Sequence, residues 1–282
     1  MKELRNGKFE GERALFFAKD LVIYDSVFEN GESPLKQSQN IEIHNTAFRW
    51  KYPMWYSRDI KVYNSILETS ARSGIWYTHN IEIMNTVIDA PKTFRRSSGI
   101  TLKNVEMKNA QESMWNCSDI SLGNVHVVGD YFAMNCENIV AHNLKIDGNY
   151  AFDGAKNIEI YDSVLNSKDA FWNCENVVVY NSTIDGEYLG WNSMNVRLVG
   201  CKIISNQGMC YMENLVLEDC VFERTDLAFE YSTVDAVVNS HIDSVKNVTA
   251  GRVAARSIGK IIMEEHRVDT SKTVIIVGEE NV

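Results

Sequence analysis

The sequence predicts an all-β solenoid, and two observations carry this prediction. An Asn, Asp or Gly followed by a branched apolar residue recurs every 19 to 21 residues, and apolar and polar residues alternate after each pair. A fixed period of this length is typical of a solenoid in which each repeat forms one coil of chain. The recurring pairs are Asp20-Leu21, Asn40-Ile41, Asp59-Ile60, Asn80-Ile81, Gly99-Ile100, Asp119-Ile120, Asn138-Ile139, Asn157-Ile158, Asn176-Val177, Asn195-Val196 and Asn214-Leu215.

The strands of each coil follow from the positions of its apolar residues. We number each coil from the Asn, Asp or Gly of its pair, which is position zero. Positions +3, +8 and −5 carry no charged residue in any coil, and position +1 carries none in the first eleven. The alternation from +1 to +3 and from +6 to +8 is the pattern of half-buried strands. We therefore predict about 12 coils, each with three short strands at −6 to −3, +1 to +4 and +6 to +9.

Position +5 predicts a corner of the coil. It is Asn or Asp in eleven of twelve coils, and Gly200 is the exception. These residue types tolerate the left-handed backbone conformation that a tight bend requires. Stacked Asn side chains also hydrogen-bond from coil to coil as a ladder. Since the row is periodic, a structural ladder explains it better than glycosylation or ligand binding.

The repeat also predicts how the chain is organised. Pro is rare, with three residues, and no Gly/Ser linker interrupts the repeats. We therefore predict one β-helix domain over residues 1–282. Residues 1–12 are expected to form an N-terminal cap, residues 13–245 the regular coils, and residues 246–282 an irregular last coil and a C-terminal cap.

Composition excludes several classes of partner. A formal charge of −10 argues against a nucleic-acid partner. The chain has no apolar run of membrane-spanning length and no recognisable signal peptide, so we expect a cytoplasmic protein with reduced thiols and no membrane contact. Three of the six cysteines occupy a row of small residues at position −2, which favours packing. Without a Cys-x-x-Cys motif or a His cluster, we expect no metal site and no cofactor.

One recurring motif resembles a known repeat. Asn-Ile-x-Ile-x-Asn-Ser/Thr occurs at residues 40–46 and 80–86 and, with Asp at its sixth position, at 157–163. It resembles the repeat of pectin-lyase-like proteins, which implies a right-handed parallel β-helix. More narrowly, the chain resembles a bacterial family of single-domain β-helices, a domain of unknown function. Many pectin-lyase-like proteins act on polysaccharides, but no lyase calcium site or hydrolase Asp-Asp signature is present, so the resemblance transfers no catalytic residue. Pentapeptide-repeat proteins rank second as an architecture.

Two neighbouring rows, at positions −4 and −3, are the candidates for a functional surface. Position −4, here named the tryptophan row, holds five of the six tryptophans together with four charged residues, so it is expected to face outward. Position −3, here named the amide row, is rich in Asn and Tyr. Together they predict a stripe of indoles, phenols and amides along one sheet. The predicted ligand-binding residues are Trp55, Trp76, Arg95, Arg96, Trp115, Asn116, Asn135, Trp172, Asn173, Trp191 and Asn192.

Such a stripe suits an extended carbohydrate. Sugar rings stack on aromatic faces, and their hydroxyl groups pair with amides and carboxylates. We therefore predict binding, and as a further step processing, of an oligosaccharide or polysaccharide. The alternative is a non-enzymatic structural scaffold, or a homo-oligomer that uses the stripe as its subunit interface. Two further alternatives are that the termini cover the stripe, or that its rings stack on one another to stabilise the sheet.

Asp153 is the best candidate for a catalytic residue. It is the one acid in the central part of the stripe, with Gly154 beside it and Trp172 one coil further on. Asp169, also one coil away, is a marginal second carboxyl group, and an enzyme with such a pair would be a carbohydrate-active hydrolase or lyase. An ordinary surface acid is the alternative for Asp153. Arg95 and Arg96 are suited to an anionic group such as a uronate carboxylate.

Overall fold

The computed structural model describes residues 1–278 and divides the chain into a first unit, Met1–Val140, and a second unit that begins at Ala141. Each unit is a stack of parallel strands with almost no helix, so the predicted all-β parallel solenoid is confirmed. Over the described residues the chain makes about 15 coils, and the predicted number of 12 was too low. The reason is that coils without the repeat pair precede the first copy and follow the last one.

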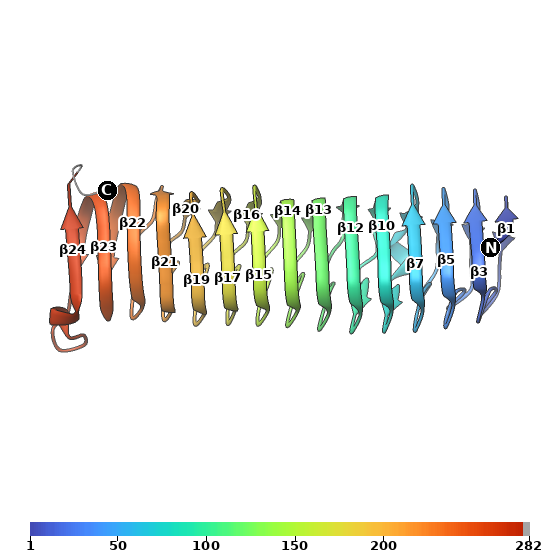
Figure 1. Ribbon diagram of the computed structural model, residues 1–282, viewed down its shortest axis with the longest axis horizontal. Coiled ribbons are helices and arrows are strands. Elements are labelled where there is room, and N and C mark those ends of the chain that lie inside the picture. Colours follow the sequence, from blue (N-terminus) through green and yellow to red (C-terminus); the bar gives the residue numbers. More distant parts are fainter. Residues whose placement is uncertain (279–282) are drawn as a thin grey trace. The chain divides into compact units, whose positions relative to one another are not determined.

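In the first unit, a long strand of each coil pairs with the long strands of its neighbours. These strands lie side by side and point the same way (Figure 1). They are β1 (Lys2–Arg5), β3 (Lys19–Tyr24), β5 (Gln39–His44), β7 (Arg58–Tyr63), β10 (His79–Ile88), β12 (Ser98–Met107) and β13 (Ser118–Val128). Shorter strands follow in the same coils, namely β2 (Lys8–Phe9), β4 (Val27–Phe28), β6 (Ala47–Phe48) and β8 (Ile66–Leu67). The 3-10 turn η1 (Thr69–Ala71) follows β8.

The second unit repeats this arrangement. Its long strands are β15 (Lys156–Tyr161), β17 (Glu175–Tyr180), β19 (Met194–Val199), β21 (Glu213–Phe222), β22 (Thr233–Lys246), β23 (Ala250–Ile262) and β24 (Thr273–Val277). The short strands are β16 (Val164–Asn166), β18 (Thr183–Asp185) and β20 (Lys202–Ile204). The 3-10 turn η2 (Thr270–Lys272) precedes β24, and β14 (Glu137–Asp147) contains the boundary between the units. No helix among the described residues is long and apolar enough to cross a membrane.

The core consists of rows of equivalent residues stacked in register. In the first unit Ile41 pairs with Leu21 on one side and Ile60 on the other, and all three are at most 5% exposed. In the second unit Val177 pairs with Ile158 and Val196 in the same way. The alternation predicted from positions +1 and +3 is thus confirmed, because each row buries like side chains against like ones.

Each of the eleven coils that carry the repeat pair turns at four left-handed corners, of which the sequence indicated one. Position +5 has positive φ as predicted, for example 48° at Asn181, and position zero does too, for example 55° at Asn195. Positions −3 and −7 also have positive φ, although they carry bulky side chains such as Tyr56 and Tyr188. A left-handed conformation is strained for such residues, so coil closure overrides the local preference there.

Asn side chains form ladders along these corners. Asn195 Nδ2 donates to Asn176 Oδ1 over 3.0 Å, and its own Oδ1 accepts from Asn214 Nδ2 at the same distance. At position +5, Asn104 links Asn124 and Asn85 through two bonds of 2.9 Å. The predicted Asn ladder is therefore present within each unit.

The third predicted strand is the weakest part of the coil. It forms as β9 (Ile75–Trp76) and β11 (Phe94–Arg95), which pair with each other, and as a single bridge from Arg95 to Trp115. The corners at −7 and −3 leave only three residues between them in these coils too, which limits the strand to two residues. Backbone bonds still join the coils on this face, for example 2.8 Å from the Met54 N–H to the Gly74 carbonyl.

Replacement of Asn195 tests the corner constraint. We expect Asn195→Ala to lower the free energy of unfolding by about 2 kcal/mol, because alanine loses two hydrogen bonds and places a Cβ in the left-handed region. Asn195→Gly should cost less, because glycine adopts this conformation without strain. Urea unfolding followed by circular dichroism measures both. Equal losses would contradict a role for the backbone conformation.

Candidate functional site

In the first unit, the tryptophan row is a continuous stack. The rings of Trp55 and Trp76 lie 5.2 Å apart and are inclined by 8°. The Arg95 guanidinium lies between the next two indoles, 4.6 Å from the ring centre of Trp76 and 4.7 Å from that of Trp115. Tyr52 covers the other end, 4.5 Å from Trp55. The stacking alternative considered from the sequence therefore describes the first unit.

This stack leaves little of the indoles for a ligand. Both faces of Trp76 contact a neighbour, Trp55 on one side and Arg95 on the other, and Arg95 covers one face of Trp115. Their N–H groups donate to backbone carbonyls of the following coil, over 2.9 Å from Trp76 to Lys92 and 2.8 Å from Trp115 to Tyr131. Stacking of sugar rings on these faces, as the sequence suggested, therefore has less geometric support here than in the second unit.

The tryptophan row of the second unit has a different arrangement. Trp191 stacks on Tyr211 at 5.2 Å and meets Tyr188 edge-on, while Trp172 has Tyr150 tilted over it at 6.0 Å. Within the described chain, the indole N–H groups of Trp172 and Trp191 have no hydrogen-bond partner, and neither is sealed from solvent. Both are thus available to a ligand.

Asp153 and Asp169 form a carboxyl pair beside Trp172. Asp153 Oδ1 accepts from Asn173 Nδ2 over 3.2 Å. Asp169 is 7% exposed, and its carboxyl group has no hydrogen-bond or ion-pair partner among residues 1–278. Burial raises the pKa of Asp169, the charge of Lys168 lowers it, and the charge of Asp153 raises it further. The two carboxyl groups therefore differ in environment: that of Asp153 is hydrogen-bonded by Asn173, whereas that of Asp169 belongs to a largely buried residue, has no partner and keeps its oxygens open to solvent.

The amide row is exposed in both units. Asn116 and Asn135 lie at the surface of the first unit, as does the neighbouring Arg96. In the second unit, Asn192 Nδ2 donates to Asn173 Oδ1 over 2.8 Å, which continues the contact of Asn173 with Asp153. The structure thus brings the predicted residues Asp153, Trp172, Asn173, Trp191 and Asn192 together in one unit. Trp55, Trp76, Arg95 and Trp115 meet in the other.

The sequence did not identify position −7 as part of the candidate site, although this row supplies Asp169 and Tyr188. This row varies too much in residue type to stand out as a periodic signal, since it contains Arg13, Ser33 and Tyr52. Its shared property is a left-handed backbone, which directs it to a corner beside the tryptophan row. That conformation follows from closure of the coil and not from the residues themselves.

The C-terminal part of the chain covers one end of the amide row. Arg267 Nη1 donates to the Tyr231 hydroxyl over 3.0 Å, and Lys246 pairs with the buried carboxylate of Glu230 at 2.8 Å. Gln207 Nε2 also donates to Glu230, over 2.6 Å. Cover by a terminal segment, an alternative for the stripe, therefore applies at Glu230 and Tyr231.

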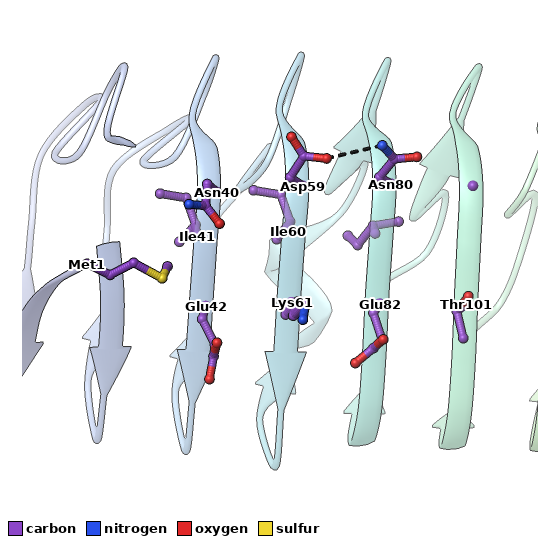
Figure 2. Close-up of a pocket in the computed structure, with 12 residues that line it drawn as sticks. Met1, Asn40, Ile41, Glu42, Asp59, Ile60, Lys61, Asn80, Glu82 and Thr101 are labelled. Atoms are coloured by element: carbon purple, nitrogen blue, oxygen red, sulfur yellow. Dashed lines mark hydrogen bonds between the residues drawn. The ribbon is translucent and has the colours of Figure 1, made fainter. Parts of the chain in front are cut away.

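A groove of about 410 Å³ lies on a different surface of the first unit, the outward face of β5, β7, β10 and β12. Figure 2 shows Glu42, Lys61 and Glu82 in a row across adjacent strands, with Asp59 and Asn80 beside one another in a second row. Asn80 Nδ2 donates to Asp59 Oδ1 over 3.1 Å.

Most polar groups of this groove already have partners. Glu42 pairs with His44 at 2.6 Å, and the Tyr63 hydroxyl donates to Glu82 over 2.5 Å. His44 and Tyr63 belong to a ring stack at position +4, with centroids 5.0 Å apart. Burial, followed by the bond to Glu82, raises the pKa of Tyr63. We therefore rank the groove below the carboxyl pair of the second unit as a candidate site.

The cysteines offer little chemistry. All six are free and buried. Cys174 Sγ donates to the Phe152 carbonyl over 2.9 Å, and burial raises the pKa of its thiol, which disfavours the reactive thiolate. Among residues 1–278, no group of three or more His, Cys, Asp or Glu side chains is placed to hold a metal ion.

The fold and its stacked rows define the class of protein, a parallel β-solenoid with a polar and aromatic row on one side of its coils. Residues 2–276 match the model of the family described as protein of unknown function DUF3737, and the chain belongs to that family. Comparison with curated proteins finds no match.

Solved structures similar to this chain come from several functional classes. HetL, a pentapeptide repeat protein from the cyanobacterium Nostoc sp. strain PCC 7120, has 10% identity and a TM-score of 0.35, over 80% of this chain and 89% of that one. The A-module of the Azotobacter vinelandii mannuronan C-5 epimerase AlgE4 has 11% identity and a TM-score of 0.28, over 97% and 87%. The catalytic domain of a GH87 alpha-1,3-glucanase has 11% identity and a TM-score of 0.28, over 97% and 63%. At such low similarity, no activity transfers to this chain.

Replacement of single indoles tests the difference between the units. We expect Trp115→Phe to lower the free energy of unfolding by about 1–2 kcal/mol more than Trp172→Phe does. The reason is that Trp115 donates to a backbone carbonyl that would lose its partner, whereas the Trp172 N–H has no protein partner to lose. Urea unfolding of both variants measures the difference. A larger loss for Trp172→Phe would contradict this assignment.

Stability against pH tests the environment of Asp169. Its pKa is raised above the ordinary value of 3.8, so the folded protein binds this proton more tightly than the unfolded chain. Stability from this group is therefore present below pH 3.8 and is lost as pH rises through the folded pKa. We expect Asp169→Asn to raise the melting temperature at neutral pH, with the gain disappearing in acid. Asp162→Asn, at an exposed corner, is the matched control. A pH-independent gain would contradict the assignment.

Proposed function

We propose that this protein binds a carbohydrate at the cluster around Trp172 in the second unit. One observation carries the proposal: the carboxyl group of Asp169, a residue that is only 7% exposed, has no partner in the described chain and keeps its oxygens open to solvent. A carboxyl group that is unpaired and accessible within a largely buried residue is an acceptor that a ligand can reach, beside the aromatic surface of the same row. The free indole N–H groups of Trp172 and Trp191 add donors to the same row.

The chemistry of the cluster favours a polyhydroxylated ligand. Each sugar hydroxyl both donates and accepts hydrogen bonds, and the cluster offers acceptors on Asp153 and Asp169 and donors on Trp172 and Trp191. The exposed amides of Asn173 and Asn192 continue the polar surface, and aromatic carbon suits the C–H faces of a sugar ring. Such a mixture of apolar surface and a few polar groups is typical of sites for small ligands.

The carboxyl pair also supports a processing step. Burial favours the protonated form of Asp169, which could then give its proton to a glycosidic oxygen as that bond breaks. Asp153, hydrogen-bonded by Asn173, would accept a proton from the water that attacks the anomeric carbon. One water is consumed, one new hydroxyl group forms on each of the two products, and the proton on Asp153 returns to Asp169 through solvent. The proposed processing is therefore hydrolysis.

A glycan array tests the binding proposal. We expect wild-type protein to bind a subset of glycans, and Trp172→Ala and Asp169→Asn to weaken that binding by at least about tenfold, each through the loss of a ligand contact. Trp50→Ala, at a tryptophan outside the row, and Asp162→Asn are the matched controls. Absence of bound glycans, or equal binding by all variants, would contradict the proposal.

Mass spectrometry of the bound glycans tests the processing step separately. Hydrolysis predicts shorter oligosaccharides after incubation with wild-type protein and intact ones with Asp153→Asn. Recovery of intact glycans from the wild type would leave binding in place and remove hydrolysis.

A further inference from the structure

Arg95, in the first unit, is held in place without satisfying its donors. Two indoles clamp its guanidinium from opposite sides, with ring centres 4.6 Å and 4.7 Å from the central carbon. The Arg95 backbone is also fixed, since it belongs to β11 and bridges to Trp115. A guanidinium fixed in this way loses little conformational freedom when it binds a ligand.

The hydrogen-bond donors of Arg95 lack acceptors. Its Nε is the buried side-chain nitrogen that has no partner within residues 1–278. The two terminal nitrogens make no hydrogen bond in this part of the chain either, yet they are not sealed, because the side chain is 23% exposed. An acceptor from outside the chain therefore has access to the terminal nitrogens alone.

Glu112 does not fill this role. Its Oε2 is 3.9 Å from Arg95 Nη2, which is too long for a hydrogen bond. The same oxygen is 2.9 Å from Lys92 Nζ, so Lys92 is its closer partner. With Arg96 exposed next to Arg95, the four side chains Lys92, Arg95, Arg96 and Glu112 carry a net charge of +2, in a chain whose formal charge is −10. The patch is thus locally positive on an acidic protein.

We propose that Arg95, clamped between Trp76 and Trp115, binds an oxyanion through its two terminal nitrogens. The shared chemistry is a carboxylate, phosphate or sulfate group, which the planar fork of the guanidinium can hold with two parallel hydrogen bonds. Arg96 would add attraction from its exposed position. This site belongs to the first unit and does not depend on the carbohydrate proposed for the second.

Calorimetric titration of the whole protein tests the site. The probes are sodium D-glucuronate, inorganic phosphate and sodium sulfate, with D-glucose as the uncharged match of glucuronate. We expect saturable binding of at least one anion, none of glucose, and an affinity that falls as salt is added. Preference for glucuronate would indicate an acidic sugar, whereas preference for phosphate or sulfate would indicate a tetrahedral oxyanion.

Variants assign the binding to Arg95. Arg95→Met keeps an apolar chain between the indoles and should weaken anion binding by at least about tenfold, because the charged fork is gone. Arg95→Lys, which keeps the charge but not the fork, should bind with intermediate affinity. Arg58→Met, at an exposed arginine that donates to Gln39, is the matched control and should bind like the wild type.

Two outcomes would overturn the proposal. One is that none of the three anions binds the wild type at low salt or raises its melting temperature. The other is that Arg95→Met, with its fold verified by circular dichroism, binds as the wild type does. If Arg95→Met does not fold, the anion affinity of Arg95→Lys tests the proposal instead. An affinity of Arg95→Lys equal to that of the wild type would contradict recognition by the guanidinium fork.

Discussion

Backbone hydrogen bonding from each coil to the next is the constraint on which this structure depends. Every coil must present its N–H and C=O groups at the height of its neighbours, so all coils need nearly the same path. A path of 19 to 21 residues closes only if the chain bends sharply, and it does so at four left-handed corners. Asn and Asp meet this need with little strain at two corners, whereas Tyr, Arg and Gln are forced into it at the others.

The same constraint places equivalent side chains on top of one another. Like residues then stack, as Asn195 does on Asn176 and Trp55 on Trp76. In a stack of identical side chains, each member makes its hydrogen bonds or ring contacts with the members above and below it. Chemistry that remains for a ligand is therefore found where a row changes residue type. Asp153 stands directly before the indoles of the second unit, and Arg95 interrupts those of the first.

Much of the fold could be predicted because periodicity is a property of the sequence itself. The inward rows, the parallel register and the corner at position +5 all followed from counting residues between Asn-Ile pairs. The coil number was underestimated because β1, β23 and β24 continue the backbone pairing without the repeat pair. Backbone hydrogen bonds need no particular side chain, so such coils leave no mark in the sequence.

The candidate site shows where sequence reasoning ends. The composition of the tryptophan row was predictable, but its full exposure was not: the indoles and Arg95 are half-buried, and Cys210 and Glu230 are buried. The Trp115 indole donates its N–H to a backbone carbonyl of the next coil, whereas the Trp172 N–H has no partner in the described chain. Contacts between adjacent coils decide which of these occurs. The low exposure of Asp169 likewise depends on its neighbours in the fold, since most other residues at position −7 are half-buried or exposed. The sequence by itself determined the solenoid and the order of its rows, since both are repeats along the chain. Only the tertiary structure decided which polar groups lack partners, because partnership is set by distances between residues about 19 positions apart.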